Sequence, residues 1–160
     1  MDNIVIRQVK MKDAYQLHKN VFFNNRLFEV KSSIQISLSN TRKKKGFRFV
    51  AVFSNEVIGN VEIIFNTHPL MKHRALIYSL VVSQNRRRCG VGKLLVDECI
   101  KLADNYGIRI VTLSVRGGTD AEKFYKSVGF KKYGELPNGI EQLWDGKQYD
   151  ECLYYKHIEN

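Results

Sequence analysis

Residues 80–95 read LVVSQNRRRCGVGKLL, and the rest of the chain is organised around this stretch. An apolar segment runs into three arginines, then two glycines, and then an amphipathic pattern that predicts a helix. The first N–H groups of a helix have no partner within the helix and carry a partial positive charge. Glycines let a phosphate approach those N–H groups closely, and arginines add full positive charges. The stretch therefore predicts a strand, a pyrophosphate-binding turn and a helix N-terminus in succession.

The composition is that of a folded globular protein, because 44% of the 160 residues are hydrophobic and 11% are aromatic. This length predicts a single domain over residues 1–160. No apolar run approaches the roughly 18 residues that a membrane helix needs. The first residues also lack the layout of a signal peptide. We therefore expect a cytoplasmic protein without a membrane partner.

The chain is strongly basic, with 26 Lys and Arg against 16 Asp and Glu and a formal net charge of +10. This excess indicates either a well-solvated surface or an anionic partner, such as a phosphorylated cofactor, a nucleic acid or an acidic substrate. Charge alone does not separate these alternatives. The basic segment Arg42–Lys45 is open to the same two interpretations, a solvated turn or a nucleic-acid patch.

The three cysteines are odd in number and widely spaced, which argues against both a disulfide framework and a zinc site. We therefore expect no metal. Cys99 falls on the apolar face of a predicted helix and is expected in the core. Cys89 lies inside the phosphate-binding turn, and we interpret it as a spacer rather than a nucleophile because no histidine lies nearby in the sequence.

Hydrophobic periodicity predicts a mixed α/β domain with a largely antiparallel sheet. Strands are predicted at residues 4–7, 47–53, 57–65, 75–82, 109–115, 130–136 and 148–155, and helices at residues 13–25, 29–39, 90–106 and 119–128. Two helix starts resemble capping boxes, at Asp13 with Gln16 and at Thr119 with Glu122. The succession of strand, helix and strand over residues 75–115 predicts one right-handed parallel crossover.

Two well-known phosphate motifs do not fit this turn. A P-loop needs a first glycine where Arg87 stands, and Ser or Thr after Gly-Lys, where the sequence GKL at residues 92–94 has a leucine. A dinucleotide fingerprint needs a third glycine, and Leu95 stands there.

What remains is the pattern Arg-x-x-Gly-x-Gly at Arg87, Gly90 and Gly92, trailed by the sequence FYKSVGF at residues 124–130. Over residues 75–132 this combination resembles the GNAT superfamily of acetyl-coenzyme-A-dependent N-acetyltransferases. The resemblance implies a six- to seven-stranded sheet with helices on both faces and a central parallel crossover. It also implies transfer of an acetyl group from acetyl-CoA, the cosubstrate, to a primary amine by direct attack through a tetrahedral intermediate.

The resemblance further implies roles for individual residues. Main-chain groups of Leu80 and Val82 would pair with the pantetheine arm, and a main-chain N–H at that strand end would polarise the thioester carbonyl. Tyr125 would protonate the departing thiolate, although packing in the core is the alternative for this residue. Gly118 stands where many members have Asn, so that cofactor contact is either main-chain or absent. The implied cofactor-binding residues are Leu80, Val81, Val82, Arg87, Arg88, Cys89, Gly90, Val91, Gly92 and Lys93.

The sequence offers two candidates for the residue that accepts the proton of the amine. Some family members keep an acid or a histidine on the strand before the turn, but the inward positions here are Leu76 and Tyr78, and neither is a good base. If the strands at 57–65 and 75–82 pair in simple register, Glu62 lies near Tyr78 on the same face. Glu62 is therefore the candidate base, with an exposed surface glutamate as the alternative, and His73 acting through water is a second candidate.

The acceptor is expected to be a small-molecule amine, with the loop at residues 137–146 and its Trp144 as part of the acceptor wall. A hydrophobic cap on the sheet is the alternative role for Trp144. Other functions left open are a protein Lys or N-terminal acetyltransferase, a non-catalytic acyl-CoA-binding regulator and an RNA-binding protein. We expect no nucleic-acid partner, because no aromatic-interleaved RNA motif accompanies the basic segments. A homodimer is compatible with the sequence.

Overall fold

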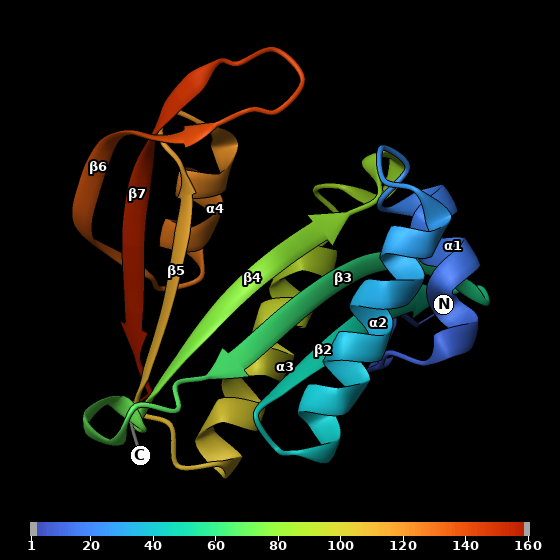
Figure 1. Cartoon of the computed structure of the whole chain (residues 1–160), viewed down its shortest axis with the longest axis horizontal. Helices are drawn as coiled ribbons and strands as arrows, with labels where there is room; N and C mark the ends of the chain where they lie inside the picture. Colours follow the sequence, from blue (N-terminus) through green and yellow to red (C-terminus); the bar gives the residue numbers. More distant parts are fainter. Residues whose placement is uncertain (1–2, 159–160) are drawn as a thin grey trace.

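The computed structural model describes residues 3–158, so the four terminal residues of the expected domain lie outside the described range. One seven-stranded sheet runs through the protein in the order β1-β2-β3-β4-β5-β7-β6. Among the strands of residues 3–158, β4 and β5 form the single parallel pair, and the other neighbours are antiparallel. This arrangement confirms the predicted fold class (Figure 1).

The N-terminal part forms an antiparallel three-stranded unit with two helices. Its elements are β1 (Val5–Gln8), α1 (Ala14–Asn20), α2 (Leu27–Arg42), β2 (Gly46–Phe53) and β3 (Glu56–Phe65). Ser54 and Asn55 join β2 to β3 with φ angles of 47° and 63°, which is the tight hairpin turn that the sequence predicts. The first helix ends earlier than predicted, whereas the second extends further in both directions.

The central crossover consists of β4 (Arg74–Val82), α3 (Val91–Asn105) and β5 (Ile110–Arg116). Gly107 follows α3 with a φ of 71°, so the helix ends on a left-handed glycine as predicted. One face of α3 is buried against the sheet through Val91, Leu95, Val96, Cys99 and Ala103. The expected place of Cys99 in the core is confirmed, since its exposed fraction is 0%.

The C-terminal part comprises α4 (Asp120–Ser127), β6 (Lys131–Glu141) and β7 (Gln148–His157). β7 lies between β5 and β6, so β6 is an edge strand. The loop predicted at 137–146 is wrong in its first part, because β6 continues through Pro137 to Glu141. An edge strand tolerates proline, whose missing N–H faces away from the partner strand. A register shift between Leu136 and Ile140 also takes the intervening residues out of regular pairing.

Helices cover both faces of the sheet, as expected. α1 and α2 pack on β2 and β3 from one face, and α3 packs on the other face, where α4 lies against β5 (Figure 1). Each face has its own hydrophobic cluster, one centred on Ile34 and Leu17 and the other on Leu95 and Tyr154. Short 3-10 turns lie at Met11–Asp13, Pro69–Met71 and Gln84–Arg86.

The predicted capping box at the start of α1 is wrong. Asp13 makes no side-chain cap to this helix. Its carboxylate instead accepts the Lys10 N–H at 2.8 Å and pairs with the Arg7 guanidinium at 2.8 Å. Gln16 reaches away from the helix start and accepts the Val57 N–H at 2.7 Å. Both side chains therefore join the helix to the sheet, because strand neighbours compete successfully with the helix terminus for their oxygens.

Candidate active site

β4 and β5 pair at one end only and then diverge. Their register runs from Arg74 opposite Ile110 to Leu76 opposite Thr112. Figure 1 shows the two strands separating beyond that point in the shape of a V. Past Leu76, the side of β4 that faces β5 has no neighbouring strand within residues 3–158. An open strand edge of this kind can pair with an extended ligand as an added strand would.

β4 carries a bulge where the V opens. Residues 60 and 62 of β3 pair with residues 81 and 78 of β4, so β4 contains one extra residue between these pairs. Ser79 lies in the bulge with a φ of 55°, which is rare for a residue other than glycine. Ile77 packs on the α3 side before the bulge, and Leu80 and Val82 pack on that side after it. The bulge therefore shifts the alternation of β4 by one residue and reorients the main chain of Leu80.

The turn after β4 presents a run of main-chain N–H groups without protein acceptors. Within the described part of the chain, no N–H group of residues 88–93 donates a hydrogen bond. The first helical bond of α3 runs from the Leu94 N–H to the Gly90 carbonyl at 3.1 Å. Free N–H groups at a helix N-terminus bind phosphate groups well. The predicted turn is thus present, and its residues fit the anionic pyrophosphate of coenzyme A. We call residues 88–93 the cradle.

Two glycines in the cradle serve different purposes. Gly90 precedes α3 with a φ of 79°, and a Cβ on it would meet no atom within 4 Å, so its requirement is conformational. At Gly92 a Cβ would lie 3.3 Å from Cζ of Phe124, which is tighter than an ordinary contact. Gly92 therefore allows the first turn of α3 to approach α4 closely.

The first two arginines before the cradle contact the protein itself. The Arg86 guanidinium lies 4.3 Å from the centroid of the Phe53 ring. Nε of Arg87 donates to the Val82 carbonyl at 3.3 Å. The Val82 carbonyl, which is expected to pair with the pantetheine arm, therefore already accepts a hydrogen bond from Arg87.

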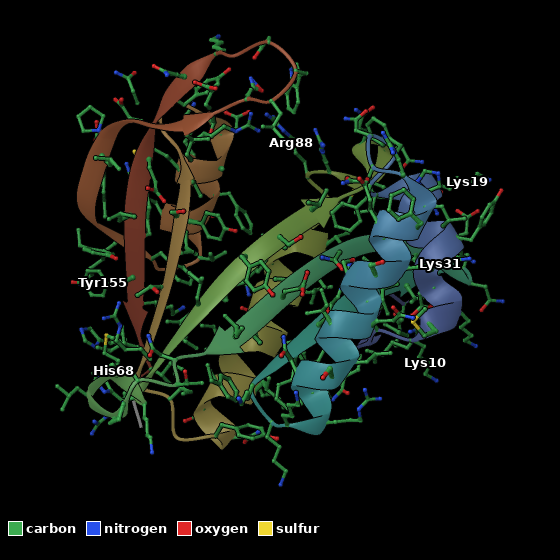
Figure 2. The ribbon with its side chains drawn as sticks, in the orientation of Figure 1. Lys10, Lys19, Lys31, His68, Arg88 and Tyr155 are labelled. Atoms are coloured by element: carbon green, nitrogen blue, oxygen red, sulfur yellow. The ribbon has the colours of Figure 1, made fainter. Side chains whose placement is uncertain are left out.

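Three cradle side chains, those of Arg88, Cys89 and Lys93, are exposed. Arg88 forms an ion pair with Asp120 of α4 at 3.5 Å, with 89% and 79% of the two side chains exposed. This pair links the turn after β4 to the other side of the V, and Figure 2 shows Arg88 near that opening. Lys93 pairs with Asp97 one turn further along α3 at 2.5 Å. The exposed Cys89 thiol donates to the Arg87 carbonyl at 3.5 Å, which is compatible with a spacer.

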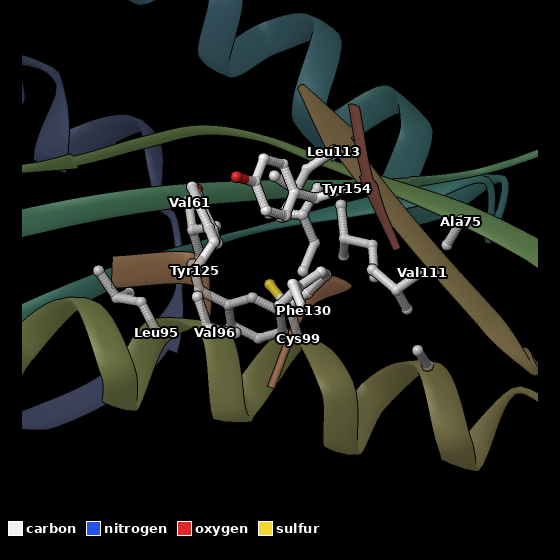
Figure 3. Close-up of a cluster of buried hydrophobic side chains, with 14 of the residues drawn as sticks. Val61, Ala75, Leu95, Val96, Cys99, Val111, Leu113, Tyr125, Phe130 and Tyr154 are labelled. Carbon is white, nitrogen blue, oxygen red and sulfur yellow. The ribbon is translucent and has the colours of Figure 1, made fainter. Parts of the chain in front are cut away.

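Tyr125 lies in the core, on α4. Only 7% of it is exposed, and its ring contacts those of Phe124 and Phe130 at centroid distances of 5.0 and 5.6 Å. Figure 3 shows it among the buried side chains near Val96 and Cys99 of α3. Burial raises the pKa of the Tyr125 hydroxyl well above its ordinary value. The hydroxyl is therefore neutral over the physiological range.

Glu62 lies directly opposite Tyr78, as predicted from the strand register. Its Oε2 accepts hydrogen bonds from the Tyr78 hydroxyl at 3.0 Å and from the Ser37 hydroxyl at 2.9 Å. Oε1 lies 3.8 Å from Nη1 of Arg48. Only 12% of the Glu62 side chain is exposed, so the alternative of an exposed surface glutamate is wrong. Burial, and next the negative charge of Glu62, raise the pKa of Tyr78 to about 12.

Arg48 and Asn60 are site residues that the sequence analysis missed. They are 2% and 0% exposed and lie in the same polar group as Glu62, Ser37 and Tyr78, which we call the buried polar network. Burial lowers the pKa of the Arg48 guanidinium from its ordinary value. The available signal was the occurrence of polar residues inside the apolar strands FRFVAVF and EVIGNVEIIF.

The turn before α4 differs from the expected capping box. The Thr119 hydroxyl donates to the Arg116 carbonyl at 2.7 Å and makes no cap to the helix. Glu122 instead accepts the Gly118 N–H at 2.8 Å and the Tyr154 hydroxyl at 2.6 Å. These bonds, the Tyr154 one foremost, lower the pKa of Glu122 to about 2. The Gly118 N–H is therefore engaged within the protein and is not a free donor for a cofactor.

Two other predicted residues lie away from this group. His73 directly precedes β4, at the end of the strand opposite the cradle, and lines a hollow with Leu70 and Tyr133. Trp144 follows β6 and is 74% exposed, so the alternative role as a cap on the sheet is wrong. Over residues 3–158, no three His, Cys, Asp or Glu side chains are grouped to hold a metal ion. No helix in that range is long and apolar enough to cross a membrane.

Comparison with protein families gives a match over residues 11–130 to the family described as "Acetyltransferase (GNAT) family". A Bacillus subtilis protein described as a candidate phosphinothricin acetyltransferase, YwnH, is 34% identical over 73 residues. That stretch covers 45% of this chain and 44% of the relative, so less than half of the relative's length is matched.

Solved structures share the fold over nearly the whole chain. A GNAT-family acetyltransferase from Streptococcus pneumoniae has a TM-score of 0.79 at 23% identity and covers 98% of this chain and 100% of its own. A ribosomal-protein-alanine N-acetyltransferase from Brucella melitensis has a TM-score of 0.82 at 20% identity over 96% and 99% of the two chains. A phosphinothricin acetyltransferase from Sinorhizobium meliloti, solved with AcCoA, has a TM-score of 0.81 at 15% identity over 97% and 88%.

Proposed function

This chain belongs to the acetyltransferase (GNAT) family, and we propose that it transfers the acetyl group of acetyl-CoA to a primary amine of a small molecule. The observation that supports this most directly is the position of the cradle, in the turn that follows β4, beyond the part of β4 that is not paired with β5. A cosubstrate held by its pyrophosphate at the cradle can extend its arm along the unpaired side of β4. Its thioester would then lie near Tyr78 and Glu62 of the buried polar network.

Acetyl-CoA supplies an activated acetyl group as a thioester. The main-chain N–H groups of residues 88–93 bind its pyrophosphate, and the open side of β4 orients its arm. A main-chain N–H near Leu80, turned by the bulge, stabilises the negative charge that develops on the carbonyl oxygen. Because these donors are fixed by the fold, they need no reorganisation during the reaction.

Two side chains move the protons. The amine arrives mainly as ammonium at neutral pH, so two protons must leave its nitrogen. Glu62 accepts the first and passes it to solvent before the attack, and it accepts the second from the nitrogen of the tetrahedral intermediate. The new bond joins that nitrogen to the acetyl carbon, and the bond between that carbon and sulfur breaks. Tyr125 donates its hydroxyl proton to the departing sulfur and later regains one from solvent. Burial raises the pKa of this hydroxyl, so it is neutral before the reaction and can donate a hydrogen bond to the sulfur as negative charge develops there.

A small acceptor is favoured over a protein by the Bacillus relative, which is named for the small molecule phosphinothricin. The Brucella structure, named for a ribosomal protein's alanine, is the reason to keep a protein N-terminus or lysine as the second candidate. Tyr78, 38% exposed, and Leu76, 42% exposed, line β4 beside Glu62 and would contact either acceptor. The cytoplasmic location and the homodimer expected from the sequence remain predictions.

The experiment that tests this function is a screen of acetyl-CoA turnover against a panel of small amines and N-terminal peptides, with release of the free thiol as readout. We expect turnover with at least one small amine and a loss of about 10²-fold in kcat for Tyr125→Phe, since general acid catalysis contributes at this level. Phe130→Tyr is a matched control, because it changes a neighbouring core ring of the same cluster without removing the Tyr125 hydroxyl.

Two outcomes would contradict the proposed function, and a third would contradict the role of Tyr125. Binding of acetyl-CoA without turnover of any amine would favour an acyl-CoA-binding regulator. Turnover of peptides alone would favour the protein acceptor. Equal kcat for Tyr125→Phe and the native protein would remove Tyr125 as the proton donor while leaving the transfer reaction intact.

A further inference from the structure

The buried polar network holds the bulge of β4 through Asn60. Nδ2 of Asn60 donates to the Ser79 carbonyl at 2.9 Å, and Oδ1 of Asn60 accepts from Nε of Arg48 at 2.6 Å. The orientation of the Asn60 amide follows from its partners. A guanidinium can only donate and a carbonyl can only accept, so the NH₂ group must face Ser79. Asn60 is fully buried, so both bonds form away from competing water.

Arg48 is itself fixed from several sides. Its Nη1 donates to the Ser33 hydroxyl at 2.9 Å and lies 3.8 Å from Oε1 of Glu62. The Phe22 ring lies 5.7 Å from its guanidinium carbon. Arg48 stands opposite Glu62 in the register of β2 and β3. One guanidinium therefore touches both the residue that holds the bulge and the candidate base.

We propose that Asn60, held in orientation by Arg48, is a positioning residue for acetyl transfer that keeps Ser79 in its left-handed conformation and thereby fixes the direction of the Leu80 main chain. This inference rests on the proposed function, in which the Leu80 region meets the thioester carbonyl. Asn60 acts through the backbone of β4 and does not touch the acetyl group.

The bulge needs such support because its conformation is unfavourable for serine. A left-handed backbone brings the Cβ of such a residue too close to the following carbonyl oxygen. Without a restraint, Ser79 would relax toward the extended region, and every later side chain of β4 would change face. The Asn60 amide opposes this relaxation by binding the Ser79 carbonyl from the neighbouring strand. A small shift of catalytic donors is enough to reduce the rate by orders of magnitude.

The decisive variant is Asn60→Asp, which keeps the shape of the side chain and an acceptor for Arg48 but removes the donor to Ser79. We expect kcat to fall about 10- to 100-fold, while the KM for acetyl-CoA stays within about threefold because the cradle still binds the pyrophosphate. Asn55→Asp is the matched control, since the same substitution then lies in the exposed turn between β2 and β3.

A rescue variant separates positioning from general stability. Glycine adopts a positive φ without strain, so Ser79→Gly alone should keep kcat within about threefold of the native value. In the double variant Asn60→Asp/Ser79→Gly, the bulge no longer depends on the amide, and we expect at least about fivefold recovery of kcat relative to Asn60→Asp. If Asn60 only stabilised the fold, the Ser79→Gly substitution would not restore the kcat of Asn60→Asp.

Hydrogen exchange provides a readout that does not require activity. Amide exchange of residues 79–82 should be faster in Asn60→Asp than in the native protein and in Asn55→Asp. Unchanged exchange there, unchanged kcat in Asn60→Asp, or no recovery in the double variant would each overturn the positioning role. Faster exchange together with a native protein that transfers no acetyl group would instead overturn the proposed function and leave the hold on the bulge established.

Discussion

The two parts of the candidate active site are built from different parts of the polypeptide. The cradle on the cofactor side consists of consecutive main-chain N–H groups, residues 88–93, and its side chains are largely exposed. The buried polar network on the acceptor side consists of side chains from α2, β2, β3 and β4, which are far apart in the sequence. The cradle should therefore be sensitive to backbone conformation and tolerant of side-chain changes. The network should show the opposite behaviour.

The largest effect is expected on the acceptor side, for Glu62→Gln. The amide keeps the size of the side chain and can still accept from Tyr78 and Ser37, but it cannot take a proton from the amine. We expect kcat/KM to fall about 10²- to 10³-fold at pH 7. The deficit should shrink at higher pH, where more of the amine is already deprotonated. Initial rates measured over a range of pH with the best amine give both the fall at pH 7 and its decrease at higher pH.

Glu56→Gln is the control for this substitution, because Glu56 begins the same strand but is exposed. Native rate and pH profile in Glu62→Gln would rule out Glu62 as the base. Loss of folding would show instead as a lower melting temperature, since the substitution also leaves the Arg48 guanidinium without its carboxylate partner.

A smaller effect is expected on the cofactor side, for Gly90→Ala. The methyl group meets no neighbour, but a φ of 79° is unfavourable for alanine, so the chain should relax and turn the cradle N–H groups away. We expect the KM for acetyl-CoA to rise about tenfold, which corresponds to about 1.4 kcal/mol. Steady-state kinetics with varied acetyl-CoA measures this change.

Gly107→Ala provides a matched comparison at the other end of α3. Gly107 has a φ of 71° and equally free surroundings, so both substitutions should lower stability by about 1 kcal/mol. Only Gly90→Ala should change the KM. An equal change in both variants would mean that the helix as a whole, rather than the cradle, determines binding.

The smallest effect is expected for Arg88→Ala. The Arg88–Asp120 pair is highly exposed and 3.5 Å apart, so its loss should change stability by less than about 0.5 kcal/mol. The KM for acetyl-CoA should change by at most about threefold, and the difference should disappear at high salt. A rise above about tenfold would show that the cofactor side depends on side-chain charge rather than on main-chain N–H groups.

Much of the fold and the cofactor side could be predicted from the sequence because their signals are local. The motif at residues 87–92, the periodicity of α3 and the left-handed Gly107 each depend on neighbours within a few turns. The pairing of Glu62 with Tyr78 could also be predicted, since a single short connection sets the register of β3 and β4.

The rest depends on contacts between distant segments. Asp13 and Thr119 have the sequence pattern of helix caps, but their oxygens bond elsewhere once the chain is folded. Arg48 lies among apolar residues of a strand, and only the packing of α2 against β2 shows that its charge is buried and paired. The bulge at Ser79 could not be predicted, because nothing in the sequence YSLVV marks a residue with a positive φ.

The divergence of β4 from β5 also has a consequence for solubility. Unpaired strand edges favour aggregation, and most proteins keep them at the periphery, where charges and proline can protect them. Here an unpaired edge lies in the middle of the sheet, with β5 and the flanking β6–β7 hairpin beside it (Figure 1). A ligand that pairs with this edge completes the sheet. Saturating acetyl-CoA should therefore raise the melting temperature and also slow aggregation of the concentrated protein.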